Sequence, residues 1–421
     1  MEDKTILGGC LDLGIAKPAD YTLIAKKIIE ENGNNLKFVV LMEGREPEFF
    51  LEYNKYNPEG FVKLNRQGPI NYYPNQSDLK SFVKAFREIG IKVFYSFWIH
   101  DSRWVFERHP ELLLTDCNGK QWHMNNFEFD FNPLLELKED SVYGIKKGQK
   151  FVEYVISQYS KLHSDFGFDG LFIGDGGMGF RVFGDDSKDL RYFDYSKRNI
   201  EQFLTWSSNN NSSNNNINHY HKDCQLLNNI ETQSTVVLSK DIHFNHFYDW
   251  IRWNCFQWAE FYKTLANYLH GIKNELAAFN CMNYGPKEAI FHGVDYKSIS
   301  QAGLDYLVFQ TYDYAGAKYF KIENKDIFTN LINLVNTKLL ISKSCSNTKV
   351  LFTIETIDNV EKWDCPLRIT LREAYTYYSE KIFDGKIWMS SADGAFIVWI
   401  NNTPYEEFGK IKSILEFALF E

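Results

Sequence analysis

Two hydrophobic patterns alternate along the chain: an amphipathic pattern with helical spacing, and a continuous apolar pattern of strand length. The clearest helical pattern ends at Gly90, where a left-handed cap is expected, and the apolar run 91–98 follows directly. The same order returns at Gly167 and at Gly303. Strands that are apolar on both faces and alternate with helices are typical of a parallel sheet covered by helices.

The pattern predicts eight strands and therefore a (β/α)8 barrel of the α/β class, formed by residues 1–421 as one catalytic domain. Eight strand–helix units over this length suit a closed barrel better than an open doubly wound sheet. The eighth strand has two candidates, 388–391 and 395–399. The predicted strands are 5–12, 37–43, 91–99, 168–175, 275–283, 304–313, 349–356 and 386–399, and the predicted helices include 144–164, 246–271, 326–340 and 366–381.

Two segments are too long to be simple connections. The loop after the third strand, about 100–143, is of a size that is usually functional near a barrel mouth. After the fourth strand, residues 207–240 form a low-complexity excursion that begins with a run of Ser and Asn. Such a run buries too little apolar surface to order itself, so we expect a disordered or mobile insertion that carries no chemistry.

The charge balance narrows the range of partners. With 46 basic and 55 acidic residues the formal net charge is −9, so we expect no nucleic-acid partner. No apolar run is long enough to span a bilayer and no signal peptide is seen, so we expect a cytoplasmic protein without a membrane partner, or a secreted one whose leader has been removed. The seven cysteines are scattered singly, which favours free thiols, and we expect no metal or other cofactor.

In a (β/α)8 barrel the active site lies at the carboxyl ends of the strands, so these ends supply the candidate catalytic residues. Asp175 ends the fourth predicted strand between glycines, which would let a substrate approach the carboxylate closely. Glu355 closes the seventh strand, where burial would be costly unless the side chain points into a polar mouth. Asp313 follows the sixth strand and competes with Glu355. Alternatively, each of these three carboxylates could be a solvated residue of a turn or loop with no part in catalysis.

Two carboxylates that face each other across a barrel mouth suit the cleavage of a glycosidic bond. One protonates the leaving oxygen, and the other attacks the anomeric carbon or activates water. A sugar also needs flat aromatic faces for its CH groups and polar side chains for its hydroxyls. Residues of both kinds lie at or just beyond the predicted strand ends, and we predict that these bind the substrate: Glu43, Trp98, His100, Asp101, Trp104, Trp122, Asn283, Gln310, Tyr312 and Trp399.

Aromatic residues make up 17% of the chain, with 35 Phe, 25 Tyr and 10 Trp. Most of the Phe residues, together with Trp250, Trp253 and Trp258 at helical spacing, are predicted to pack in the core. Core packing is also the alternative for each single ring at a strand end.

Three segments together resemble glycoside hydrolases of the (β/α)8 type. The stretch 97–104, with the His-Pro-Glu turn at 109–111 and the Asp-x-x-Gly at 116–119, is similar to the loop after the third strand in several barrel glycosidases. Residues 168–175 are similar to their fourth strand, and Glu355 stands at the end of the seventh. The resemblance implies a hydrolase with a carbohydrate substrate, without singling out one family.

The resemblance leaves two catalytic pairings. Barrels of the largest retaining clan carry Asn-Glu at the end of the fourth strand, where this chain has Gly174-Asp175. Similarity to alpha-galactosidase-like and alpha-glucosidase-like barrels would make Asp175 the nucleophile and Asp313 the acid. Similarity to barrels that use strands four and seven would make Asp175 the acid/base and Glu355 the nucleophile. We favour the second pairing, with retention of configuration.

Two functions of other classes stay open. A non-catalytic carbohydrate-binding barrel would use the carboxylates only to bind hydroxyls. A metal-dependent barrel hydrolase or lyase would use Glu43, His100, Asp101 and Asp175, although the first strand lacks a His-x-His pair.

Overall fold

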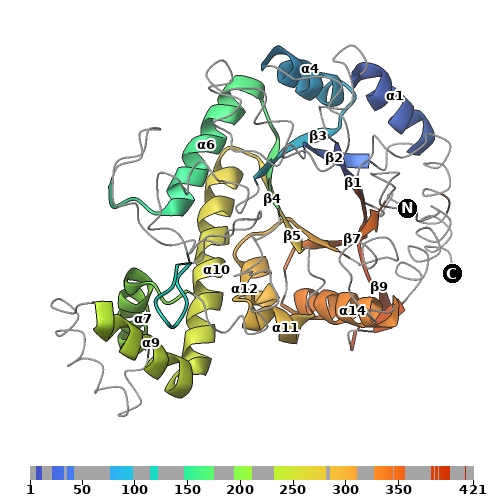
Figure 1. The fold of residues 1–421 in the computed structure, drawn as a ribbon. Helices are drawn as coiled ribbons and strands as arrows, with labels where there is room; N and C mark the ends of the chain where they lie inside the picture. Colours follow the sequence, from blue (N-terminus) through green and yellow to red (C-terminus); the bar gives the residue numbers. More distant parts are fainter. Residues whose placement is uncertain are drawn as a thin grey trace, which may run out of the picture.

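Eight parallel strands close into a barrel, in the order β1-β10-β7-β6-β5-β4-β3-β2 (Figure 1). The structure is a computed structural model, and it describes residues 6–11, 21–32, 36–41, 76–97, 114–121, 147–174, 194–210, 232–280, 285–310, 327–344, 346–355, 381–383, 385–386, 388–398 and 413. The barrel strands are β1 (Ile6–Leu11), β2 (Leu36–Leu41), β3 (Lys92–Phe97), β4 (Gly170–Ile173), β5 (Glu275–Asn280), β6 (Tyr306–Phe309), β7 (Lys349–Glu355) and β10 (Gly394–Val398). The predicted (β/α)8 fold is confirmed.

The two candidates for the eighth strand belong to different sheets. The second candidate supplies β10, which pairs in parallel with β7 and β1 and closes the barrel. The first supplies β9 (Trp388–Ser390), which pairs antiparallel with β8 (Lys381–Phe383) outside the barrel. The single predicted strand 386–399 is therefore two strands, and Ser391 to Asp393 separate them.

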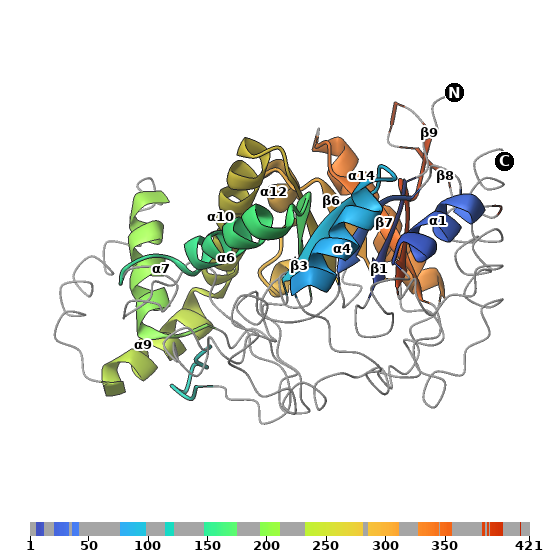
Figure 2. The ribbon, with the colours of Figure 1, turned by 90° about the horizontal axis from the view of Figure 1, so that it is seen from above.

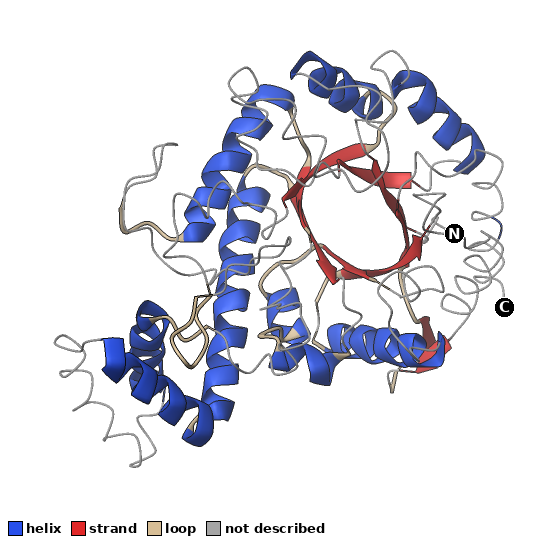
Figure 3. Cartoon of the chain, viewed as in Figure 1, coloured by secondary structure: helices blue, strands red, loops and turns tan. Residues whose placement is uncertain are grey.

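Helices surround the barrel, and two of them match their predicted ranges closely (Figure 3). The predicted helices 246–271 and 326–340 are α10 and α14, whereas 366–380 lies outside the described residues. The described helices are α1 (Tyr21–Asn32), α4 (Gln76–Arg87), α6 (Phe151–Phe166), α7 (Lys197–Asn210), α9 (Thr232–Asn245), α10 (Phe247–Gly271), α11 (Pro286–Phe291), α12 (Tyr296–Gln301) and α14 (Ile327–Lys343).

Helix α6 begins seven residues later than the predicted start at 144. Gly148 has a φ of 88°, a left-handed conformation that a helix does not accommodate. The backbone N–H of Lys150 then donates to the carboxylate of Glu153 at 2.9 Å, so a capping box starts the helix after the turn. At the other end Gly167, with a φ of 80°, forms the expected left-handed cap.

Phenylalanine rings fill the barrel interior. Phe172 on β4 stacks on Phe396 on β10, with ring centroids 5.6 Å apart, although these strands are not neighbours in the sheet. The two rings therefore meet across the interior. Gly8 and Gly170 make room, because a Cβ on either would lie 2.6 Å from the ring of Phe38 or Phe94 respectively. The inward-facing buried cluster comprises Cys10, Phe38, Val40, Phe94, Phe172, Ala277, Phe279, Val308, Leu351 and Phe396.

Three aspartates, each directly before a barrel strand, tie the amino-terminal end of the barrel together. Asp169, Asp305 and Asp393 precede β4, β6 and β10, respectively. Each carboxylate accepts the backbone N–H of a residue in the preceding barrel strand, and the backbone N–H of each aspartate donates back to the carbonyl of that residue. Each aspartate carbonyl also accepts the N–H of the first residue in the strand on its other side. Each aspartate thus connects three strands. The N–H···O distances to the carboxylates are 3.0 Å from Val93 to Asp169, 2.8 Å from Leu276 to Asp305 and 2.8 Å from Val350 to Asp393.

Each of these aspartates also pairs with a cationic or ionisable side chain from the helix before the preceding strand. Arg87 lies 3.4 Å from Asp169, His270 lies 2.9 Å from Asp305, and Lys338 lies 2.5 Å from Asp393. The pairs differ in their access to water. The Lys338 side chain is only 11% exposed, whereas that of Arg87 is 52% exposed. The aspartates therefore fasten helices as well as strands.

A second apolar cluster lies to one side of the barrel, in what we call the helical extension: α7, α9 and the amino-terminal half of α10. Both views place α7 and α9 away from the barrel strands (Figures 1 and 2). Trp258 and the rest of α10 pack in the barrel core, whereas Trp250 and Trp253 pack with α7 and α9. The predicted core position of all three Trp residues is confirmed, since their exposure is 4% or less.

The helical extension takes in both ends of the segment that was predicted to be a low-complexity excursion. Residues 207–210 form the last turn of α7, and residues 232–240 belong to α9. Ser207 is buried, because α7 places it on the packed side of the helix. Residues 211–231 lie outside the described residues.

We predict that Asp393→Ala destabilises the protein more than Asp169→Ala does. Without Asp393, a largely buried Lys338 ammonium loses its partner, which costs about 3–5 kcal/mol. Without Asp169, the exposed Arg87 is solvated, and the loss is about 1–2 kcal/mol, mainly from the unsatisfied Val93 N–H. Urea unfolding of both variants measures the difference. Glu88→Ala, which breaks only an exposed ion pair with Lys84, is the control, and equal losses for the two aspartates would contradict the argument.

Candidate functional site

All eight strands run in parallel, so their carboxyl ends lie at one end of the barrel, which we call the mouth. Two of the predicted site residues, Glu355 and Gln310, belong to the described part of the chain. The others lie outside the described residues: Glu43, Trp98, His100, Asp101, Trp104, Trp122, Asp175, Asn283, Tyr312, Asp313 and Trp399.

Glu355 is the last residue of β7, at the mouth. It is in the same alternation phase as Leu351, which belongs to the inward-facing cluster. Its register partner on β10 is Val398, the residue before Trp399. Barrel closure thus brings the end of β7, at a predicted catalytic residue, beside the end of β10, the strand that a predicted sugar-binding tryptophan follows in the sequence.

The end of β4 gives a second pairing of the same kind. The backbone N–H of Gly174 donates to the carbonyl of Phe97 at 2.9 Å, so the ladder between β3 and β4 continues to the residue before Asp175. Phe97 is in turn the residue before Trp98. The predicted carboxylate and the predicted aromatic residue therefore each follow one member of a hydrogen-bonded backbone pair.

The barrel interior beneath the mouth carries polar side chains as well as phenylalanine rings. Gln310, directly after β6, is 8% exposed, and Thr353 on β7 is 3% exposed. Ser96 on β3 is fully buried beside Phe172, its register partner, and its Oγ has no hydrogen-bond partner within the part of the chain that the structure describes. The sequence-based reasoning missed Ser96 and Thr353. Their signal is a small hydroxyl side chain at an inward position of an otherwise apolar strand.

The opposite, amino-terminal end of the interior holds an ion pair. The Lys92 ammonium donates to the Glu275 carboxylate at 2.5 Å. Burial, followed by the charges of Glu275 and Asp305, raises the pKa of the Tyr306 phenol, which stays neutral at physiological pH. These charged groups lie at the amino-terminal ends of β3, β5 and β6, away from the mouth.

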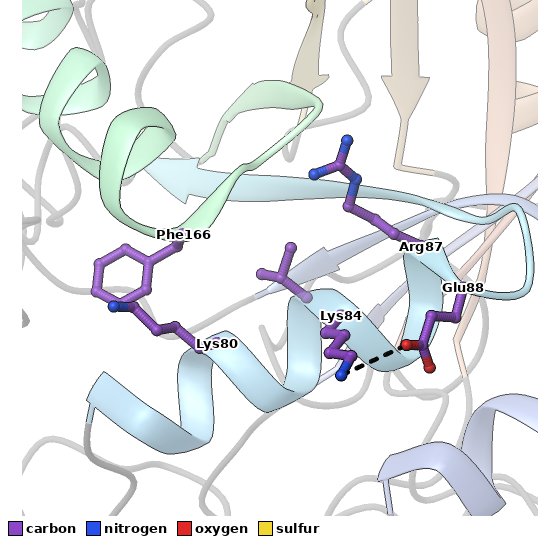
Figure 4. A pocket seen from close by; sticks show the side chains of 6 residues that line it. Lys80, Lys84, Arg87, Glu88 and Phe166 are labelled. Atoms are coloured by element: carbon purple, nitrogen blue, oxygen red, sulfur yellow. Dashed lines mark ion pairs between the residues drawn. The ribbon is translucent and has the colours of Figure 1, made fainter.

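A hollow on the outer surface is not part of this site. It lies between α4 and α6, and it is lined by Lys80, Val83, Lys84, Arg87, Glu88 and Phe166 (Figure 4). Lys84 pairs with Glu88 at 3.6 Å, and the Lys80 ammonium lies 5.8 Å from the centroid of the Phe166 ring. These are ordinary contacts of an exposed helix face, and none of the predicted site residues takes part.

The described cysteines Cys10, Cys117 and Cys255 form no disulfide with one another. Burial raises the pKa of Cys255 to about 12, so this thiol is protonated and a poor nucleophile at neutral pH. Among the described residues, no three His, Cys, Asp or Glu side chains gather as metal ligands would. In the same part of the chain, no helix combines the length and the apolar character that a membrane crossing requires.

Comparison with known proteins gives a likeness in fold without a likeness in sequence. No protein-family model and no curated protein sequence matches the chain. Among solved structures, the chain is similar to the beta-galactosidase of the psychrophilic Marinomonas ef1, with a TM-score of 0.55 and 10% identity over 97% of this chain and 59% of the other. It is also similar to the beta-galactosidase of the Antarctic haloarchaeon Halorubrum lacusprofundi, with a TM-score of 0.54 and 10% identity over 99% and 58%.

A cold-adapted beta-galactosidase from Rahnella sp. R3 is similar at a TM-score of 0.50, with 12% identity over 99% of this chain and 57% of the other. These structural neighbours are glycoside hydrolases. The likeness is one of fold. The chain spans less than three-fifths of the length of each of these three proteins.

We predict that Ser96→Ala leaves the free energy of unfolding unchanged or raises it by up to about 1 kcal/mol, because the Ser96 hydroxyl is buried and no described residue bonds to it. Thr348→Val is the matched control. The Thr348 hydroxyl donates to the Leu304 carbonyl at 2.6 Å, so its loss should cost about 1–3 kcal/mol. Chemical unfolding of both variants gives the comparison. A similar loss for Ser96→Ala would mean that Ser96 has a bonding partner in solution.

Proposed function

We propose that the protein is a glycoside hydrolase that cleaves glycosidic bonds of an oligo- or polysaccharide with two carboxylates at the mouth, Asp175 and Glu355. The observation that carries the proposal is the place of Glu355: it ends β7 in the inward alternation phase of Leu351. The carboxyl ends of the strands are where (β/α)8 barrels place their catalytic residues. The fold shared with beta-galactosidases supports the same chemistry.

The spacing of the strands suits two carboxylates that act on one sugar. In the barrel order β5 and β6 stand between β4 and β7. Carboxylates that follow or end β4 and β7 thus come from separate parts of the rim, and we propose that a sugar ring binds between them. In the favoured pairing Asp175 protonates the leaving oxygen and Glu355 attacks the anomeric carbon, and Asp175 then activates the water that releases the sugar.

The alternative pairing uses Asp313 in place of Glu355. Asp313 follows Gln310 by three residues, and only β5 stands between β6 and β4 in the barrel order. Asp175 would then be the nucleophile and Asp313 the acid. The pairing with Glu355 has the more direct support, because Glu355 is itself part of a barrel strand.

The neighbours of the two carboxylates suit a carbohydrate. Trp98 follows the partner of Gly174, and Trp399 follows the partner of Glu355. Trp98 and Trp399 thus follow strand ends that neighbour those of the two carboxylates, and we propose that these tryptophans offer the aromatic faces against which the CH groups of a sugar stack. The hydroxyl and amide groups of Ser96, Thr353 and Gln310 supply polar groups beneath.

We predict that Asp175→Asn and Glu355→Gln each lower kcat/KM for an activated aryl glycoside by at least about a thousandfold, because each removes an acid or a nucleophile while it keeps the side-chain volume. The assay uses a panel of 4-nitrophenyl glycosides of both anomers, followed by unsubstituted oligosaccharides. Glu88→Gln, which alters an exposed carboxylate on α4, is the control and should keep full activity.

The outcomes separate the proposed function from its alternatives. Activity of both variants within tenfold of the wild type would exclude this catalytic pair. Loss of activity in Asp313→Asn but not in Glu355→Gln would favour the other pairing. Sugar binding by titration calorimetry without release of reducing ends would indicate a carbohydrate-binding barrel, and a stoichiometric divalent ion in the active protein would indicate the metal-dependent reaction.

We further predict that the first product keeps the anomeric configuration of the substrate, as the favoured pairing requires. Retention goes with carboxyl groups about 5–5.5 Å apart, and inversion with a separation of about 6.5–9.5 Å that leaves room for a water molecule. Proton NMR of the anomeric signal during the first minutes of hydrolysis measures the outcome. An inverted product would mean that no covalent glycosyl-enzyme forms.

A further inference from the structure

The middle of the long loop between β3 and α6 forms a hairpin of its own, residues 114–121. Thr115 and Gln121 pair in an antiparallel bridge. The carboxylate of Asp116 accepts the backbone N–H groups of Asn118 and Lys120 at 2.8 and 3.0 Å, so the turn is closed from inside. The hairpin belongs to a loop that starts at the mouth, directly after Phe97.

Asp194 connects this hairpin to the helical extension. The Asp194 side chain is fully buried. Its carboxylate accepts the backbone N–H of Thr115 at 2.8 Å, the backbone N–H of Ser196 at 3.1 Å and the Ser196 hydroxyl at 2.9 Å. The next residue, Tyr195, donates its backbone N–H to the carbonyl of Thr115 at 2.7 Å. Two backbone groups of the hairpin are thus bonded to Asp194 and its neighbour.

On the other side, Asp194 is held by the helices of the extension. Its carbonyl accepts the side-chain amide of Asn199 on α7 at 2.6 Å, and the Asn199 amide oxygen accepts the indole N–H of Trp253 on α10 at 2.8 Å. Tyr195 stacks on Trp250 with centroids 4.7 Å apart and an angle of 8° between the rings. The anchor for the hairpin is therefore a buried and well-packed part of the extension.

The hairpin also packs directly on the extension. Cys117 lies in the same apolar cluster as Trp250 and Trp253. A Cβ placed on Gly119, at the turn, would lie 3.0 Å from a methyl carbon of Val236 on α9. Two chain segments that leave the barrel after different strands are thus combined into one body beside it.

We propose that Asp194 is a positioning residue: it fixes the middle of the β3–α6 loop on the helical extension and so limits the conformations of the loop that begins beside the mouth. The hairpin and β3 are the two described ends of the segment 98–113, which carries predicted sugar-binding residues, and a chain anchored at both ends has fewer conformations than one anchored at one end. The effect on substrate rests on the proposed glycosidase function, whereas the fixing of the hairpin does not.

The test compares Asp194→Ala with Asp194→Asn in the full chain. Asn keeps an acceptor for the Thr115 and Ser196 N–H groups, and Ala does not. We expect Asp194→Ala to raise KM for an oligosaccharide by about tenfold with kcat within about threefold, because a misplaced loop weakens binding more than chemistry. Tryptic cleavage after Lys120, followed by mass spectrometry, should become at least about tenfold faster as the hairpin is released. Asp194→Asn should stay close to the wild type in both measurements.

Asp295→Ala is the matched control, because Asp295 also accepts two bonds, from the Lys297 N–H at 3.1 Å and the Ser298 hydroxyl at 2.5 Å, but at the start of α12. It should change neither KM nor cleavage after Lys120. Ser196→Ala, which removes one of the three bonds, should give a smaller change in the same direction and serves if Asp194→Ala does not fold.

Unchanged KM in Asp194→Ala, with or without faster cleavage, would overturn the positioning role, and so would an equal rise of KM in Asp295→Ala. If the wild type hydrolyses no glycoside, the proposed function fails on its own account. The rate of cleavage after Lys120 then still decides whether Asp194 fixes the hairpin.

Discussion

The structure depends on how the first backbone N–H groups of its strands are satisfied. Val93, Leu276 and Val350, near the starts of their strands, are buried, and an unpaired buried N–H is costly. Asp169, Asp305 and Asp393 meet this constraint in the same way: each carboxylate accepts a strand N–H and pairs with a basic side chain on a neighbouring helix. Each aspartate also bonds the strand on its other side through its carbonyl. The three residues therefore link seven of the eight barrel strands, all except β2.

This arrangement divides the barrel into an end that stabilises and an end that is available for chemistry. The amino-terminal end uses its charged groups on one another, as in the pair of Lys92 and Glu275. Phenylalanine rings and other apolar side chains fill the interior. At the mouth, β7 ends at Glu355, and the ladder between β3 and β4 ends at the residue before Asp175. A general property of (β/α)8 enzymes is that stability is built at one end and catalysis at the other.

The aromatic residues follow the same division. Rings such as Phe172 and Phe396 fill an interior that the absence of a side chain at Gly8 and Gly170 leaves open. Tryptophans on α10 instead join the barrel to the helical extension. Composition predicted a large aromatic core, but it did not distinguish these uses, because a ring at an inward strand position and a ring on a helix contribute equally to a count.

The local pattern of the sequence was enough to predict the fold, because the order of helix, glycine and apolar strand indicated the barrel. It also predicted that Asp175 and Glu355 stand at the ends of the fourth and seventh strands. It misplaced the start of α6, where one left-handed glycine outweighs the helical pattern, and it left open which of 388–391 and 395–399 closes the barrel. Only the tertiary structure decided which strand ends are neighbours. Val398 lies beside Glu355 and Gly174 beside Phe97 because closure of the barrel sets the hydrogen-bond register between strands that are distant in sequence, and no local pattern carries that register.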